Sequence, residues 1–193
     1  SGTVNIKPFY FKFNSSVSNV NLLNIIFFNK IFEDILTNFF LDNSNLNGKI
    51  NVNIDDVKKS KYFEKGKIIL NIKRGKFDLS GTEFIIKNIG NIKIVSNQFL
   101  IEDDKLNMQF NTKFTIVDKD KLYRKFLIPR KNRLDIKEIY YLMDIYPSSG
   151  ETIISNFEID EKNNKFYQDT VFSINTWQDL RNMFNDLLIN YDG

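Results

Sequence analysis

Residues 105–117 read KLNMQFNTKFTIV, and apolar side chains alternate with polar ones along most of this segment. Successive side chains of a β-strand point to opposite faces of a sheet, so the alternation predicts a strand with one apolar face. The same two-residue period runs through residues 46–117, and its short breaks predict antiparallel hairpins in a long meander. The breaks carry Gly, Asn or Asp and lie at 65–66, 74–75, 88–90 and 102–104.

Further strands are predicted on both sides of this region. Residues 4–13 alternate in the same way and predict one strand, which we place at an edge of the sheet because Pro8 has no backbone N–H to donate. Three more strands are predicted within residues 134–146, around residues 153–157 and within residues 166–174. The sheet is therefore expected to continue almost to the end of the chain.

Three helices are predicted from apolar residues at helical spacing. In the first, residues 20–41, charged and amide side chains fall on one narrow face and leave a wide apolar arc. These polar residues interrupt the segment too often for it to span a membrane. A short helix over residues 118–128 is stopped by Pro129. An amphipathic helix closes the chain and begins at a capping box formed by Thr176 and Asp179.

Together these elements predict an α+β fold dominated by a long, curved antiparallel sheet with the shape of a groove, on which the first helix packs. We expect a single domain over residues 1–193, excised from a longer protein. Its expected parts are a cloning scar at residues 1–2, a strand and the long helix over 3–45, the antiparallel meander over 46–174, and the C-terminal helix over 175–193.

The chain has no His and no Cys. Imidazole bases, thiol nucleophiles, metal sites built on these ligands and Ser-His-Asp triads are therefore excluded. Carboxylates cluster at Asp55-Asp56, at residues 102–104 and at Asp118 with Asp120. Each cluster lies at a break between elements, which favours turn and helix-cap roles. We therefore expect no enzyme activity, no catalytic residue, no metal site and no cofactor.

Basic residues gather in two segments, the first of which holds Lys58, Lys59 and Lys61. Acidic residues interleave with the basic ones and the net charge is only +3, which favours a solvated surface. An anionic membrane or phosphate surface is the alternative, and nucleic acid is a weaker third. The second segment holds Lys119, Lys121, Arg124, Lys125, Arg130, Lys131 and Arg133.

The apolar strand faces allow two interpretations. They form a closed core if they pack against one another and the helices, or they line a groove for lipid chains if the sheet stays open. A helix over residues 20–41 spans roughly 33 Å and is about 10 Å wide. A sheet of eight strands is about 38 Å across, which is wider than the helix. We therefore expect part of the apolar face to stay uncovered. The predicted groove residues are Ile68, Leu70, Ile72, Phe77, Leu79, Met108, Phe110, Phe114 and Ile116.

The segment Leu46-Asn47-Gly48-Lys49-Ile50 resembles the L-x-G-x-[IL] strand that opens a hairpin series in the C-terminal region of AsmA-like proteins. The similarity continues through the strand, turn and short helix of residues 111–129, through the IPRKNR step at residues 128–133, and into the closing helix. It covers residues 46–193.

The resemblance implies an envelope protein of Gram-negative bacteria related to AsmA, TamB and YhdP. Such a protein is anchored in the inner membrane by a segment outside this chain, and its periplasmic part acts in outer-membrane biogenesis or phospholipid transfer through an apolar β-groove. Phospholipid and other envelope proteins are the partners that it implies, and no site residue carries over. The rival hypothesis is a structural or protein-interaction scaffold that has no ligand.

Overall fold

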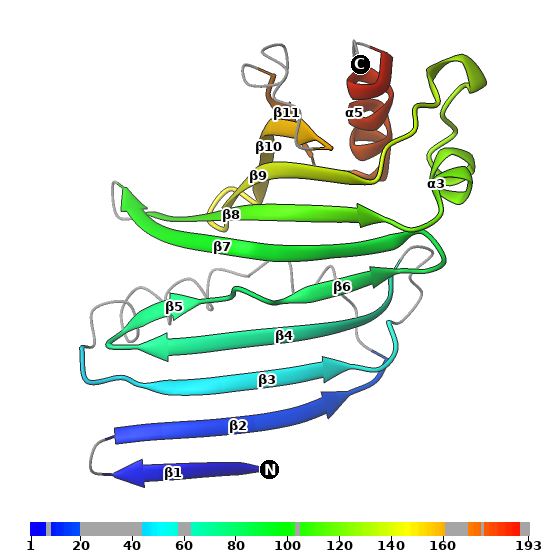
Figure 1. Cartoon of the computed structure of the whole chain (residues 1–193). Coiled ribbons are helices and arrows are strands. Elements are labelled where there is room, and N and C mark those ends of the chain that lie inside the picture. The colour runs from blue at the N-terminus through cyan, green and yellow to red at the C-terminus, as the bar shows by residue number, and fades with distance from the viewer. Residues whose placement is uncertain are drawn as a thin grey trace.

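The computed structural model describes residues 1–6, 9–19, 44–57, 63–102, 105–160, 170–174 and 176–189. Within these ranges, eleven strands form one sheet, and two α-helices and a short 3-10 turn accompany it (Figure 1). The strands are β1 (Gly2–Ile6), β2 (Phe9–Val17), β3 (Gly48–Ile54), β4 (Phe63–Lys73), β5 (Lys76–Asp78), β6 (Glu83–Ile86), β7 (Gly90–Glu102), β8 (Lys105–Ile116), β9 (Glu138–Tyr146), β10 (Glu151–Ile159) and β11 (Phe172–Ser173). The other elements are α3 (Lys119–Lys125), η2 (Arg130–Asn132) and α5 (Trp177–Ile189).

The strands follow the order β1-β2-β3-β4-β6-β7-β8-β9-β10-β11, and β5 also pairs with β4. Every neighbouring pair from β3 onward is antiparallel, as the alternating sequence predicts for residues 46–174. β2 and β3 run parallel, so the whole sheet is mixed and the prediction of a purely antiparallel sheet is wrong. The β-dominated α+β class is confirmed.

The predicted strand over residues 4–13 is two strands. β1 and β2 form an antiparallel hairpin in which Ile6 pairs with Phe9 and Val4 with Phe11. Ile6 and Phe9 are three positions apart, so the two-residue period changes phase between them while both strands keep their apolar side chains on one face. The interpretation as one strand overlooked this phase change. Pro8 lies outside the described residues.

The predicted break at Lys65-Gly66 is also wrong, because β4 runs through both residues. A Cβ atom on Gly66 would lie 2.8 Å from a ring carbon of Phe84 on β6. The glycine therefore makes room for the aromatic ring of the neighbouring strand, and no turn is needed to explain it.

Both described helices begin as their sequences predict. The Asp118 carboxylate accepts a hydrogen bond from the backbone N–H of Lys121 at 2.9 Å and caps α3. Thr176 and Asp179 form the predicted capping box of α5, with Asp179 N donating to Thr176 Oγ1 at 3.2 Å and Thr176 N donating to Asp179 Oδ2 at 2.7 Å. The predicted helix over residues 20–41 lies outside the described residues, so the structure does not bear it out.

The two helices lie at one end of the sheet. Figure 1 shows α3 and α5 beside β9, β10 and β11, with β1 at the opposite end of the strand ladder. Phe184 and Leu187 of α5 belong to one apolar cluster with Phe114 of β8 and Phe157 of β10. The described helices therefore cover the C-terminal end of the sheet.

Candidate functional site: an apolar face of the sheet

The strand register places the predicted groove residues on one side of the sheet, which we call the apolar face. Phe84 of β6 lies opposite Gly66 of β4 and Ile92 of β7, and Ile92 lies opposite Phe114 of β8. Because side chains alternate along each strand, the face also carries Ile68, Leu70 and Ile72 on β4, Phe77 on β5, and Met108, Phe110 and Ile116 on β8. Leu79, one residue beyond β5, packs against the same cluster as Phe77.

The other side of the sheet, which we call the polar face, carries charged and amide side chains together with a few apolar ones such as Ile69 and Ile85. Lys67 and Asn71 of β4 point to this side, as does Lys113 of β8, whose ammonium group lies 2.7 Å from the Glu138 carboxylate on β9. The hydrogen bond to Glu138 is the largest cause that raises the pKa of Lys113. This division into an apolar and a polar face is the one that the alternating sequence predicts.

Most of the predicted groove residues are buried. Met108 has no exposed surface and Phe114 is only 1% exposed. Ile72, Phe77, Phe110 and Ile116 are buried as well, whereas Ile68, Leu70 and Leu79 are half-buried. The structure therefore brings the nine residues onto one face but places six of them in the core. Their role in binding lipid stays a prediction.

Near α5 the apolar face is filled. The Phe184 ring lies 6.1 Å from the Phe114 ring and 4.7 Å from the Phe126 ring, measured between centroids. A cavity of about 40 Å³ remains between α5 and the sheet, and its lining includes Tyr141, whose pKa is raised by burial. A cavity of roughly 150 Å³ is needed to hold benzene, so this space is too small for an acyl chain.

The apolar face opens at the N-terminal hairpin. Val4 and Ile6 of β1 are 64% and 80% exposed, and Phe9 and Phe13 of β2 are 43% and 46% exposed. They share the apolar face because Val4 pairs with Phe11 and Phe13 pairs with Ile50, the partner of Leu70. The outer edge of β1 has no strand partner among the described residues.

These exposed hairpin residues are absent from the predicted groove set. The alternation of residues 4–13 is visible in the sequence, but it does not say which part of the face is left uncovered. A useful signal is the low charge of the segment: residues 1–6 contain no Lys, Arg, Asp or Glu. Edge strands are usually protected by such charges.

Asp160 and Asp78 are carboxylates near the sheet that have structural roles. Asp160 accepts hydrogen bonds from the backbone N–H groups of Lys137 and Glu138 at 2.9 and 2.8 Å. The Ser80 side chain donates to Asp78 and lowers the pKa of that carboxyl group. Across the described part of the chain, no three acidic side chains are grouped in a way that would hold a metal ion.

Neither described helix has the length and apolarity to cross a membrane. Comparisons of the chain with protein-family models, with curated proteins and with solved structures find no match.

Proposed function

We propose that this chain is a non-enzymatic periplasmic module of an AsmA-like protein, in which the apolar face of the sheet binds the acyl chains of phospholipids during lipid transfer or outer-membrane biogenesis. The observation that carries the proposal is the apolar face itself. Each strand between the core and the N-terminal hairpin contributes apolar side chains to it, and it ends at the exposed side chains of Val4, Ile6, Phe9 and Phe13. The membrane anchor of such a protein would lie outside this chain.

Binding of this kind needs no catalytic group. Burying an acyl chain on an apolar surface gains about 0.8 kcal/mol for each CH₂ group. The chain has no His or Cys. Asp78 is engaged in a turn, Asp118 in a helix cap, and Asp160 in hydrogen bonds with the backbone at the start of β9. The module would therefore act passively, and the energy for directed transfer would come from another protein.

The hairpin is the place where a lipid chain would meet the sheet. The end near α5 is filled by Phe184 and its neighbours, whereas Phe13 and Ile6 are exposed. We therefore place the binding surface on β1 and β2, with the half-buried Ile68 and Leu70 as its continuation toward the core. This position differs from the centre of the predicted groove set.

Two neighbouring residues of β2 provide the test. Phe13 and Lys12 are both exposed, but Phe13 lies on the apolar face and Lys12 on the polar face. A benzophenone amino acid is placed at either position, and the purified chain is irradiated with phospholipid vesicles. We expect mass spectrometry to find phospholipid attached at position 13 and at least fivefold less at position 12. Equal labelling at both positions, or none at position 13 in a folded protein, contradicts the proposal.

A scaffold without a ligand is the second candidate. It is favoured by the burial of six predicted groove residues, among them Met108 and Phe114, within the chain itself. In that case the hairpin face would contact protein. Crosslinks from position 13 to protein, with none to lipid, would support this alternative.

A further inference from the structure

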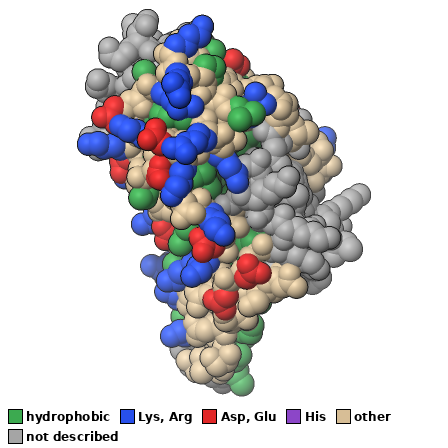
Figure 2. Space-filling view, turned by 90° about the vertical axis from the view of Figure 1, so that its right-hand side faces the viewer, with side chains coloured by type: hydrophobic (Ala, Val, Ile, Leu, Met, Phe, Trp, Pro, Cys, Tyr) green, Lys and Arg blue, Asp and Glu red, His purple; other side chains and the backbone are tan. Residues whose placement is uncertain are grey.

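A basic cleft lies at the corner where the β6–β7 turn meets α3. It has a volume of about 370 Å³ and is lined by Lys87, Asn88, Ile89, Lys121, Arg124 and Lys125. Figure 2 views the molecule from the side that carries α3 in Figure 1 and shows many Lys and Arg side chains over the upper half, with some Asp and Glu side chains among them. Four of the six lining residues are cationic, and none is acidic.

Backbone hydrogen bonds fix the two walls of this cleft against each other. The Ile89 carbonyl oxygen accepts from the backbone N–H of Val117 at 2.7 Å and from that of Asp118 at 3.1 Å. Ile89 is 3% exposed, so the turn is anchored in the core. Asn88 precedes it with φ of 57°, a left-handed conformation that Asn adopts more readily than most residues. The Lys87 and Asn88 side chains are thus held close to the start of α3.

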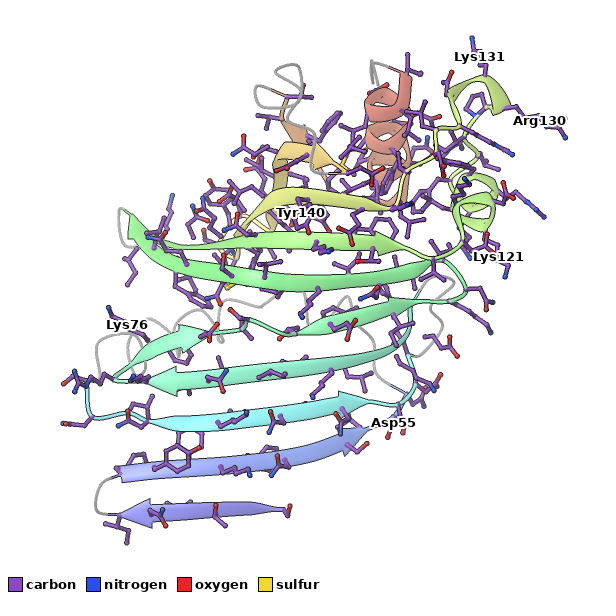
Figure 3. All side chains as sticks on the ribbon, in the orientation of Figure 1. Asp55, Lys76, Lys121, Arg130, Lys131 and Tyr140 are labelled. Atoms are coloured by element: carbon purple, nitrogen blue, oxygen red, sulfur yellow. The ribbon has the colours of Figure 1, made fainter. Side chains whose placement is uncertain are left out.

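The sequence of α3 directs its basic residues to the cleft. Lys121, Arg124 and Lys125 are three and four positions apart and share one side of the helix. Leu122 and Tyr123 are buried on the other side. Figure 3 shows Lys121 projecting outward from α3, with Arg130 and Lys131 of η2 above it at the same end of the molecule.

Carboxylates compensate little of this positive charge. Asp118 lies 3.1 Å from the Lys121 ammonium group. Lys119 forms an ion pair with Asp135 and is not part of the lining. Within the described ranges, no carboxylate lies within ion-pair distance of Lys87 or Arg124. Among the described residues, Lys87 and Arg124 therefore form no ion pair that an entering anion would have to break, although the Asp118 carboxylate also interacts electrostatically with Arg124.

We propose that this cleft binds a phosphate group carried by a small molecule or by a lipid headgroup. A guanidinium group presents a planar pair of N–H donors that matches two phosphate oxygens, and lysine ammonium groups add point charges. Arg124 supplies the first and Lys87 and Lys121 the second, while the amide of Asn88 adds a neutral donor at the rim. The proposal rests on this corner alone and does not depend on lipid binding at the apolar face.

The test uses the whole chain and two phosphate sources. Binding of glycerol 3-phosphate is followed by NMR titration, with glycerol as the uncharged control. Binding to vesicles of phosphatidylglycerol is compared with binding to vesicles of phosphatidylcholine. The test variant is Lys87→Gln with Arg124→Gln, and both side chains are exposed, so the fold should persist. The matched variant is Lys73→Gln with Lys76→Gln, which removes the same charge from exposed residues. Figure 3 places Lys76 at the ends of the strands that lie opposite α3.

We expect the test variant to bind at least tenfold more weakly than the unchanged chain, and the matched variant to stay within twofold. Binding should also weaken as salt is raised, because exposed charges are screened over a Debye length of about 10 Å at 0.1 M salt. Loss of glycerol 3-phosphate binding in the test variant identifies a free phosphate compound as ligand, and loss of vesicle binding alone identifies a lipid headgroup. Equal weakening in both variants, or no binding to either phosphate source, overturns the proposal.

Discussion

The ring of Phe184 on α5 meets the ring of Phe114 on β8 edge-on, with the planes inclined at 70° and the centroids 6.1 Å apart. Such tilted pairs are the favoured geometry of aromatic side chains. The contact joins the last helix to the C-terminal part of the longest predicted alternating strand, and both residues are at least 94% buried. The C-terminal helix is thus part of the core.

Truncation of the Phe184 side chain should therefore lower the stability of the protein. We expect Phe184→Ala to lower the free energy of unfolding by about 3–5 kcal/mol, because a buried ring is lost. Leu180→Ala should cost less, since Leu180 is half-buried. Ile189→Ala on the same helix is the control, because its side chain is 57% exposed. Urea denaturation measures all three, and equal effects at positions 184 and 189 would show that α5 is not docked on the sheet.

Gly90 should tolerate no side chain. A Cβ atom there would lie 1.9 Å from the backbone carbonyl oxygen of Thr115 on β8, so Gly90→Ala must push β7 and β8 apart. We expect a loss of about 3 kcal/mol or more. Gly150→Ala is the comparison, because its new methyl group meets open space but its φ of +70° costs about 1–2 kcal/mol. Thermal and urea unfolding should rank the two variants in this order, and the reverse order would contradict the close approach.

The cap of α3 should make stability depend on pH in acid. The backbone N–H of Lys121 donates to Asp118 and is the main cause that lowers the pKa of this carboxyl group below its ordinary value of 3.8. A lowered pKa in the folded state stabilises the fold above pH 3.8, and this contribution is lost as pH falls through the folded pKa. Asp118→Asn keeps an acceptor at the cap but does not titrate. The difference in unfolding free energy between the two proteins should therefore shrink below about pH 4, and a constant difference would contradict this account.

The exposed edge of β1 should promote aggregation. Val4 and Ile6 are exposed on a strand that lacks charged residues and whose outer edge has no strand partner within the described ranges, and such an edge is the usual template for intermolecular strand pairing. We expect Ile6→Lys to slow aggregation of the concentrated protein several-fold, as measured by light scattering. Val171→Lys adds the same charge at a residue that is 62% exposed elsewhere, and it should have little effect. An equal effect of both substitutions would point to net charge instead.

The sequence predicts those features of the fold that depend on neighbours along the chain. The alternation of residues 105–117 gives β8 and the side of the sheet that its residues face. Thr176 and Asp179 give the start of α5, and Asp118 gives that of α3, because a cap is a contact over three residues. These signals are local, so tertiary packing does not alter them.

The features that the sequence does not reveal depend on distant contacts. The two-residue alternation of apolar residues in β2 does not predict that this strand pairs in parallel with β3. Gly66 is a residue type that is common in turns, but here it leaves space for the ring of Phe84. Alternation identifies the apolar face, yet it does not tell buried Met108 from exposed Phe13, since the difference lies in what covers each residue. The exposed part of the candidate site was therefore the part that sequence analysis missed.

The parallel pairing of β2 with β3 also divides the sheet into two units that differ in local stability. Asn14 and Asn51 share a hydrogen bond of 2.8 Å across this seam, although they lie 37 residues apart in the sequence. Closing so long a separation carries an entropy cost that the local hairpins of the rest of the sheet do not bear. We therefore expect the β1–β2 pair to detach as one unit before the antiparallel ladders from β3 onward open. We expect the amide protons of β1 and β2 to exchange with solvent sooner than those of β7 and β8. In solution the sheet would then exist in two forms, one with the β1–β2 hairpin and one without it.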